Sequence, residues 1–316
     1  MPNWNQILTE IMGSGGPGKS PDFDGVRRAY LAKLHVLTHR NTICYYSGWL
    51  SKDYIQSMGI NDEDKNGFMS AIYGLDTSVG LDLIIHTPGG SIAATQSIVY
   101  YLQKKFGKDI RAFIPQIAMS AGTMLACSCK EIVMGHHSNL GPIDPLLRDI
   151  PAQGIRREFR TAYKEMTKDP NTLRVWRPIL EQYRPTFLNQ CENAVKWSNE
   201  FVREQLASVM FDGDPQAKEK ARRIVRKLSD FQGNKSHERH IHADECRDIG
   251  LPITQLEDHP DLQEAVLSVH HAYMVTLANT PAYKFIENHM GSAQVKNVNR
   301  PKSVPLLIPQ PIQKPK

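Results

Sequence analysis

The chain has 316 residues, 41% hydrophobic and 22% charged, which is ordinary for a globular protein with a buried core. Its net charge is only +5, and its Lys and Arg residues form no stripe interleaved with aromatic residues, so nucleic-acid binding is not expected. No apolar run reaches the length of about 18 residues that a membrane span requires. Five cysteines without a Cys-x-x-Cys pair, and an N-terminus unlike a signal peptide, predict reduced thiols in a cytoplasmic protein.

The first 24 residues predict a short amphipathic helix over 1–12 and a Gly/Pro/Ser linker over 13–24. The linker contains Gly13-Ser14-Gly15-Gly16-Pro17-Gly18-Lys19-Ser20, which matches the phosphate-binding pattern G-x-x-x-x-G-K-S. That chemistry needs a buried strand before the loop and a helix directly after it. Here a helical pattern precedes the loop and Pro21 follows it, so we interpret the segment as a linker.

Strands and helices then alternate as far as residue 134. Helices are predicted over 24–37, 61–75, 91–106 and 120–129, and strands over 41–47, 81–86, 110–117 and 131–134. Strands that are nearly continuous apolar runs between helices predict a parallel sheet covered on both faces. The predicted fold class is therefore α/β.

The second half of the chain has a mostly helical pattern. Helices are predicted over 154–168, 173–182, 186–210, 214–228 and 261–279, with a helix that ends at Gly250 and a strand around Ile253. The Pro- and Lys-rich residues 297–316 predict a disordered or partner-binding segment. We therefore expect a helix and linker over 1–24, a main domain over 25–280 with a helical insertion at about 154–230, and a Pro/Lys-rich tail over 281–316. The insertion is expected to pack on the sheet edge or on another subunit.

Ser120 is the position that points most directly to chemistry. It lies between the predicted strand 110–117 and the next helix, so its hydroxyl is expected at a strand-to-helix turn. One strand–helix unit earlier, Gly89 and Gly90 follow the strand 81–86 and leave backbone N–H groups free to hold an anion. Both turns are expected at the edge of the sheet where α/β folds bind ligands. A serine beside an oxyanion site predicts acyl transfer.

Three motifs resemble the Clp/crotonase-fold serine proteases, and the serine dehydrogenase proteinase family most closely. They are Ile84-Ile85-His86-Thr87-Pro88-Gly89-Gly90-Ser91, Met119-Ser120-Ala121-Gly122 and Leu140-Gly141-Pro142-Ile143-Asp144-Pro145. The resemblance implies a Clp/crotonase-like fold and a homo-oligomeric serine peptidase that hydrolyses peptides or unfolded protein through a Ser120 acyl-enzyme. It also implies an oxyanion hole made by the backbone N–H groups of Gly90 (or Gly89) and Ala121, and no metal or organic cofactor.

The motifs do not identify the general base that takes the proton from Ser120. The caseinolytic Clp peptidase has a catalytic histidine in the stretch that corresponds to the residues around Asp144. This chain has no histidine there, which argues against a triad of that type. Signal peptide peptidases use a lysine from a later helix, and residues 162–166 resemble the sequence around it. The resemblance thus favours Lys164, with Lys168 and His237 as alternatives. A lysine base must be desolvated so that it is largely neutral.

His237, His240 and His242 form a histidine-rich patch that permits three interpretations. His237 could supply the base, His240 and His242 could share a strand face and contribute to a zinc site, or all three could be solvated loop residues. Two other functions also remain open. A crotonase-type acyl-CoA enzyme would need a carboxylate near the acyl chain and no nucleophile at Ser120, and a catalytically inactive scaffold would bind a partner through the tail.

Overall fold

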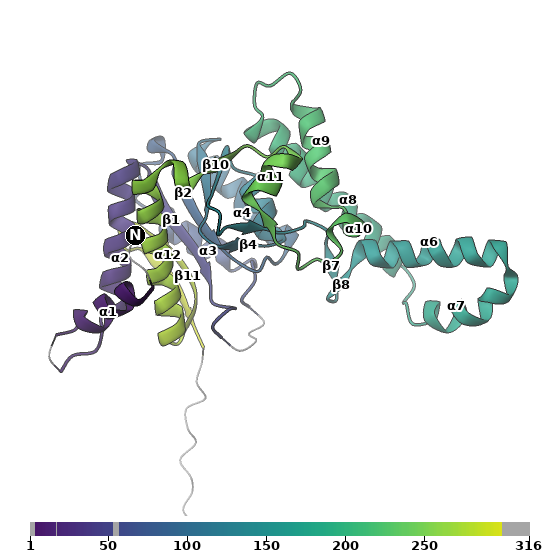
Figure 1. The fold of residues 1–316 in the computed structure, drawn as a ribbon, viewed down its shortest axis with the longest axis horizontal. Coiled ribbons are helices and arrows are strands. Elements are labelled where there is room, and N and C mark those ends of the chain that lie inside the picture. The colour runs from purple at the N-terminus through teal and green to yellow at the C-terminus, as the bar shows by residue number, and fades with distance from the viewer. Residues whose placement is uncertain (1–3, 17, 53–56, 299–316) are drawn as a thin grey trace, which may run out of the picture.

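The computed structural model describes residues 4–16, 18–52 and 57–298. At its centre lies a seven-stranded sheet with the order β10-β5-β3-β2-β1-β11-β12 (Figure 1). The strands are β1 (Asn41–Ser47), β2 (Leu81–His86), β3 (Ile110–Ile114), β5 (Glu131–Met134), β10 (Ile253–Gln255), β11 (Ala282–Asn288) and β12 (Ala293–Asn297). The first five strands in this order are parallel, whereas β11 pairs antiparallel with both β1 and β12.

Helices cover both faces of this sheet, because successive side chains of a strand point to opposite sides. On one face, Ile43 and Leu83 share a core with α3 (Asp64–Ile72), α4 (Ile92–Phe106) and α5 (Ala121–Cys127). On the other face, Cys44 and Ile84 share a core with α2 (Phe23–Thr38) and α12 (Pro260–Asn279). Helix α1 (Trp4–Ser14) packs against α2 and α12. All residues of β1 and β2 are buried, as expected for parallel strands between two helical layers.

A small three-stranded sheet lies next to the main one. Its order is β4-β6-β9, formed by β4 (Ile117–Ala118), β6 (Asn139–Leu140) and β9 (Ile241–His242). Strands β4 and β6 are parallel, and β9 is antiparallel to β6. A bridge between Thr87 and Ala118 connects this sheet to the segment after β2, and α11 (Ala243–Ile249) leads from β9 towards β10.

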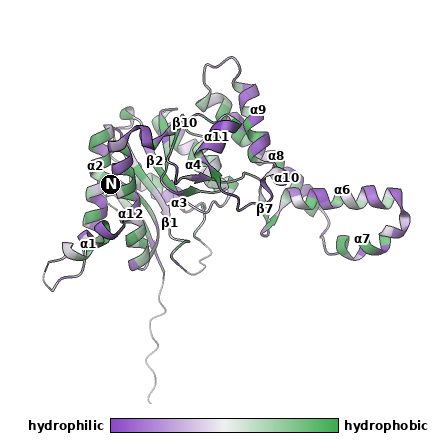
Figure 2. Cartoon of the chain, in the orientation of Figure 1, coloured by the Kyte–Doolittle hydropathy of each residue, from purple (hydrophilic) through white to green (hydrophobic). Residues whose placement is uncertain are grey.

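A helical insertion separates β6 from β9. Its elements are β7 (Leu146–Leu147), β8 (Ile150–Pro151), α6 (Ala152–Lys168), α7 (Leu173–Leu180), α8 (Phe187–Gln205), a π turn (Leu206–Met210), α9 (Ala217–Leu228) and α10 (Phe231–Asn234). Phe201 of α8 and Ile224 of α9 are buried in the main core. In contrast, α6 and α7 extend away from the sheet as an arm, with hydrophobic and hydrophilic residues on both helices (Figures 1 and 2). Single 3-10 turns at Thr77–Val79, Pro170–Thr172 and Leu256–Asp258 complete the elements.

The predicted α/β fold with a largely parallel sheet is confirmed. The predicted strands 41–47, 81–86 and 131–134 have the same bounds as β1, β2 and β5. The strand predicted over 110–117 is instead divided into β3 and β4, which belong to different sheets. Pro115 stands at the break and has no N–H group for a continuous ladder.

The C-terminal end of the main domain differs from the prediction. The boundary was expected at residue 280, but β11 and β12 extend the main sheet beyond it. Lys284 and Glu287 are charged residues in β11 that are nevertheless buried, and this breaks the apolar pattern by which a strand is recognised. The remainder of the predicted tail, 299–316, lies outside the described residues.

Two further features of the sequence can be compared with the structure. The G-x-x-x-x-G-K-S segment begins within the last two residues of the helix α1, so the described residues before it do not supply the strand that a phosphate-binding loop requires. The five cysteines are buried free thiols, as predicted. No helix within the described residues is both long and apolar enough to cross a membrane.

Candidate active site

Ser120 precedes the first residue of α5 in a strained backbone conformation. Its φ is 50° and its ψ is −113°, which a residue with a side chain adopts only at an energetic cost. The chain turns here from β4 into α5 within two residues, Met119 and Ser120. The Ser120 side chain forms no capping hydrogen bond to α5. Strain of this kind persists where the surrounding structure enforces it, and such positions cluster at active sites.

The Gly89-Gly90 turn packs directly against Ser120. Gly89 and Gly90 have φ values of +104° and +148°, a range that favours glycine. A Cβ atom on Gly89 would lie 2.8 Å from Ser120 Cβ and 3.2 Å from Ala121 N, so only glycine permits this approach. In the described part of the chain, the N–H groups of Gly90 and Ala121 donate to no backbone or side-chain acceptor. Two free donors next to a serine hydroxyl can stabilise an oxyanion.

Gly90→Ala is expected to slow acylation of Ser120 by up to about a hundredfold, because a displacement of about 1 Å at a reacting centre has effects of this size. A Cβ atom on Gly90 would lie 2.3 Å from Ile60 N and 2.4 Å from Ile60 O, so the turn must move. The rate of acylation by an activated ester measures the effect. Gly107→Ala is the matched control, since Gly107 also has a positive φ of 62° but an added Cβ would have no neighbour within 4 Å. Equal rates in the two variants would contradict the role of the turn.

Asp144 and His237 form a hydrogen-bonded pair. His237 Nδ1 lies 3.0 Å from Asp144 Oδ1, although the two residues are 93 positions apart in the chain. The side chain of Asp144 is 1% exposed and that of His237 is 14% exposed. A carboxylate at Nδ1 orients the ring and leaves Nε2 free to accept a proton. The stretch around Asp144 contains no histidine, as the sequence shows, but His237 from a distant segment pairs with this carboxylate.

The small sheet directs Ser120, Asp144 and His237 to the same end. Ser120 follows β4 and Asp144 follows β6, and these two strands are parallel. Strand β9 is antiparallel to β6, with Ile241 opposite Leu140, and the same register carried forward sets His237 opposite Asp144. Residues before β9 therefore lie at the end of the sheet where β4 and β6 finish. The strand order thus sets Ser120 at the same end of the small sheet as the hydrogen-bonded Asp144–His237 pair.

Hydrogen bonds on both sides hold Asp144 in place. The N–H of Ile143 donates to the carbonyl of Leu228 at 3.1 Å, and Ser198 Oγ donates to the carbonyl of Ile143 at 2.7 Å. On the other side, the N–H of Ala152 donates to the carbonyl of Pro145 at 2.9 Å. The backbone on both sides of Asp144 is therefore fixed by α8, α9 and the start of α6.

Lys164 and Lys168 lie on the arm formed by α6 and α7. Both side chains are exposed, and neither makes an ion pair or hydrogen bond with another described residue. A single chain thus provides neither lysine with the burial that a neutral lysine base needs. The predicted roles of Lys164 and Lys168 as base remain predictions for experiment.

His86, at the end of β2, is a second imidazole near the glycine turn. Its ring is fully buried beside Trp49 and Tyr46, with ring-centroid distances of 4.4 Å and 5.4 Å. Desolvation lowers the pKa of His86 to about 3, so the ring is neutral near pH 7 and a weak proton acceptor. Neither ring nitrogen has a hydrogen-bond partner among the described side chains and backbone. We assign this residue to the core rather than to proton transfer.

A buried ion pair lies behind the glycine turn. Lys284 Nζ is 3.0 Å from both carboxylate oxygens of Asp64 and donates to the carbonyl of Gly59 at 2.7 Å. The next residue, Ile60, donates its N–H to the carbonyl of Gly89 at 2.7 Å and accepts from the N–H of Ser91 at 2.9 Å. Desolvation lowers the pKa of Lys284 to about 8. The sequence did not indicate this connection between β11 and the turn.

The other histidines of the patch lie apart from this arrangement. His240 and His242 are exposed, with His242 in β9. Among residues 4–16, 18–52 and 57–298, no group of three or more His, Cys, Asp or Glu side chains is placed to hold a metal ion. Of the three histidines, only His237 therefore has a buried carboxylate partner among the described residues and is a candidate base.

Comparisons with known proteins agree with the predicted family. A family model described as ClpP-like SDH-type serine proteinase matches residues 39–300. Two similar proteins of Methanocaldococcus jannaschii are the uncharacterized protein MJ0137, 30% identical over 194 residues, and the uncharacterized protein MJ1495, 27% identical over 194 residues. Each alignment covers 61% of this chain, and they cover 60% and 59% of the two relatives. The chain thus spans about three fifths of the length of the curated relatives it matches.

Proposed function

Because this chain belongs to the ClpP-like SDH-type serine proteinase family, we propose that it is a serine endopeptidase that hydrolyses peptides or unfolded protein through an acyl-enzyme on Ser120. The observation that carries the proposal is the contact between the Gly89-Gly90 turn and Ser120. It puts two free N–H groups beside a strained serine, and acyl transfer needs both components.

In the proposed reaction, Ser120 Oγ attacks the scissile carbonyl carbon while His237 Nε2 takes the hydroxyl proton. The N–H groups of Gly90 and Ala121 stabilise the oxyanion of the tetrahedral intermediate. When the C–N bond breaks, His237 returns the proton to the leaving amine. Water then attacks the acyl-enzyme with His237 again as base, which releases the acid product and restores Ser120. Asp144 keeps the His237 ring oriented and stabilises its protonated form throughout.

We favour His237 over Lys164 as the base, although the resemblance favoured the lysine. The 3.0 Å bond to Asp144 supports this choice, because it gives His237 the orienting partner that a general base uses. Lys164 is exposed on the arm and has no such partner within the described residues. It remains the competing proposal, with Lys168 as its neighbour.

A fluorophosphonate probe tests the proposal. It is expected to attach covalently to Ser120 in the wild type, with no labelling of Ser120→Ala, because only an activated serine reacts with it. Hydrolysis of casein-like substrates is expected to be lost in the same variant. A folded wild-type protein that neither labels nor hydrolyses casein would contradict the proposal and favour an acyl-CoA enzyme or a scaffold. Circular dichroism and thermal unfolding verify that the proteins compared are folded.

We also propose that the chain forms a homo-oligomer and acts in the cytoplasm. Exposed apolar side chains on the arm, including Tyr163 at 73% and Val175 at 63% exposure, support a contact surface between copies. Five free buried cysteines support a reducing compartment. Analytical ultracentrifugation measures the first property, and a single-chain mass at micromolar concentration would contradict it.

A further inference from the structure

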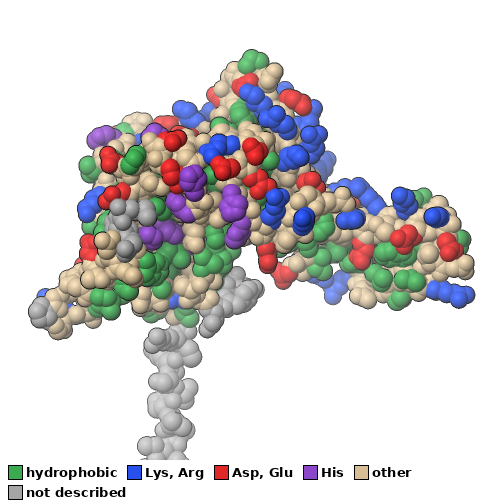
Figure 3. Space-filling view, in the orientation of Figure 1, with side chains coloured by type: hydrophobic (Ala, Val, Ile, Leu, Met, Phe, Trp, Pro, Cys, Tyr) green, Lys and Arg blue, Asp and Glu red, His purple; other side chains and the backbone are tan. Residues whose placement is uncertain are grey.

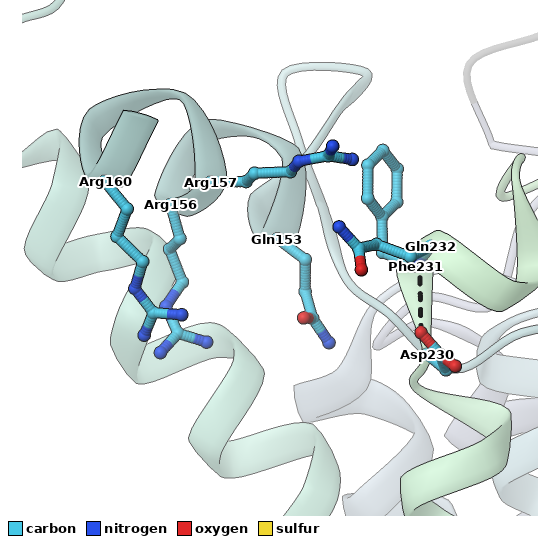
Figure 4. Close-up of a pocket in the computed structure, with 7 residues that line it drawn as sticks. All are labelled: Gln153, Arg156, Arg157, Arg160, Asp230, Phe231 and Gln232. Atoms are coloured by element: carbon cyan, nitrogen blue, oxygen red, sulfur yellow. Dashed lines mark hydrogen bonds between the residues drawn. The ribbon is translucent and has the colours of Figure 1, made fainter. Parts of the chain in front are cut away.

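A pocket of about 260 Å³ opens between the start of α6 and the N-terminal end of α10 (Figure 4). Three arginines of α6, Arg156, Arg157 and Arg160, line one side, and Asp230 and Phe231 line the other. The guanidinium groups of Arg156 and Arg160 lie side by side, while Arg157 reaches towards Phe231 (Figure 4). Lys and Arg side chains also cover the surface near the start of α6 and along α9 (Figure 3).

Among the described residues, positive charge is in excess in this pocket, because three guanidinium groups line it against the single carboxylate of Asp230, and Glu192 forms only a long ion pair with Arg156. The nearest carboxylate to Arg156 is that of Glu192, whose Oε1 is 3.9 Å from Arg156 Nε, too far for a hydrogen bond. Arg156 Nε is buried, and no described residue accepts a hydrogen bond from it. Arg157 and Arg160 form no ion pair with any described residue. Asp230 is already engaged, because its Oδ1 accepts from the N–H groups of Gln232 and Gly233.

The position of the arginines on α6 adds to this imbalance. They follow the first turn of a 17-residue helix, with Arg160 at its middle, and that first turn contains no acidic residue. The positive end of the helix dipole lies in the turn before them, and it favours an anion there. Pro151 at the N-cap supplies no side-chain acceptor for the free N–H groups of the first turn. An anion in the pocket would therefore pair with the arginines close to a helix end that also favours negative charge.

Both walls of the pocket are connected to the segment that holds Asp144. Ala152, the first residue of α6, donates its N–H to the carbonyl of Pro145, directly after Asp144. Gln153 Nε2 donates to the carbonyl of Ser229 at 2.6 Å, which ties α6 to the opposite wall. That wall leads through α10 to His237. The pocket is therefore built on the same two segments as the Asp144–His237 pair.

We propose that this arginine pocket binds the carboxylate of an Asp or Glu side chain in the substrate, so that the enzyme prefers acidic peptides. The inference rests on the peptidase function proposed above. A carboxylate suits the paired guanidinium groups, which can donate several charge-assisted hydrogen bonds to it. Peptides with glutamine in place of glutamate preserve shape and remove the charge, and they are the matched comparison.

The first experiment compares cleavage of such peptide pairs. A casein-derived peptide with a mapped cleavage site is synthesised with Glu or with Gln at each position near that site. For wild type, kcat/KM is expected to be about two- to fivefold higher for one or more Glu peptides, which is the range for partly exposed charge pairs. This preference is expected to fall to near one in Arg156→Gln/Arg160→Gln, and to fall also as salt is raised. Arg174→Gln/Arg177→Gln is the control, since it removes the same charge from exposed residues of α7.

The second experiment measures binding without catalysis. Fluorescence anisotropy of a labelled acidic peptide with Ser120→Ala is expected to detect binding that is weakened by Arg156→Gln/Arg160→Gln but not by Arg174→Gln/Arg177→Gln. Binding with this pattern in an inactive protein supports the pocket even if the peptidase function fails. If the wild type cleaves the peptides but shows no preference for Glu, the peptidase function is supported and the proposed role of the pocket is contradicted. A changed sedimentation mass for Arg156→Gln/Arg160→Gln would also overturn it, by assigning the pocket to a contact between copies.

Discussion

His237→Ala is expected to lower the rate of Ser120 acylation by about a hundredfold or more, the usual effect of removing a general base. Lys164→Ala and Lys168→Ala are expected to retain rates near that of the wild type. Asp144→Asn is also expected to lose activity strongly, because an amide at Nδ1 no longer favours the tautomer with a free Nε2. Stopped-flow acylation with an activated ester measures all four variants.

His240→Ala is the matched control for His237→Ala. It removes a histidine three positions away that is exposed and lies outside the proposed site. A hundredfold loss in Lys164→Ala, with activity retained in His237→Ala, would reject the histidine and establish the lysine. Equal losses in His237→Ala and His240→Ala would indicate a general disturbance of the loop rather than loss of a base.

The parallel sheet could be predicted from the sequence because its strands are locally encoded. The strand β1 contains β-branched and aromatic residues, β2 is a nearly continuous apolar run, and every residue in both is buried. Ser120 and the Gly89-Gly90 turn could be predicted for the same reason, since each motif is continuous in sequence. Their mutual contact followed from the rule that parallel strands place their carboxyl ends together.

The pairing of Asp144 with His237 could not be predicted in this way. It depends on the register between β6 and β9, which are strands of two residues each and carry no periodic signal. The helical insertion between them conceals that the two segments meet. The strand β11 was missed for a different reason, because its buried charges, Lys284 and Glu287, have partners on α3 and α2 that a local pattern does not contain.

Lys284→Met is expected to slow acylation of Ser120 by about ten- to a hundredfold, with a smaller change in KM. The ammonium group holds the carbonyl of Gly59, and the adjacent Ile60 holds the carbonyl of Gly89, so its loss frees the turn that carries the oxyanion donors. The variant also leaves the buried Asp64 carboxylate without its closest cation, which costs up to about 3–5 kcal/mol of stability. Acylation rates are therefore compared at a temperature where the protein remains folded.

Glu287→Gln is the control for Lys284→Met, because it is expected to lower stability without changing the geometry of the Gly89-Gly90 turn. Glu287 also lies in β11 and forms a buried ion pair with Arg27, but none of its hydrogen bonds reaches residues 59–61. It is expected to destabilise the fold while acylation by the folded fraction stays near the wild-type rate. If both variants lose activity in proportion to their stability, Lys284 has only a structural role.

The pH dependence provides an independent test of Lys284. Its pKa of about 8 lies below the ordinary value of 10.5, so between these values the unfolded chain binds the extra proton and this group adds stability as pH rises. Deprotonation nevertheless removes the ion pair with Asp64 and weakens the hold on Gly59. Wild-type acylation is thus expected to decline above about pH 8 without a fall in thermal stability from this group. Lys284→Arg keeps its charge and is expected to lack that decline, and an unchanged alkaline limb would contradict the role of Lys284 in positioning the turn.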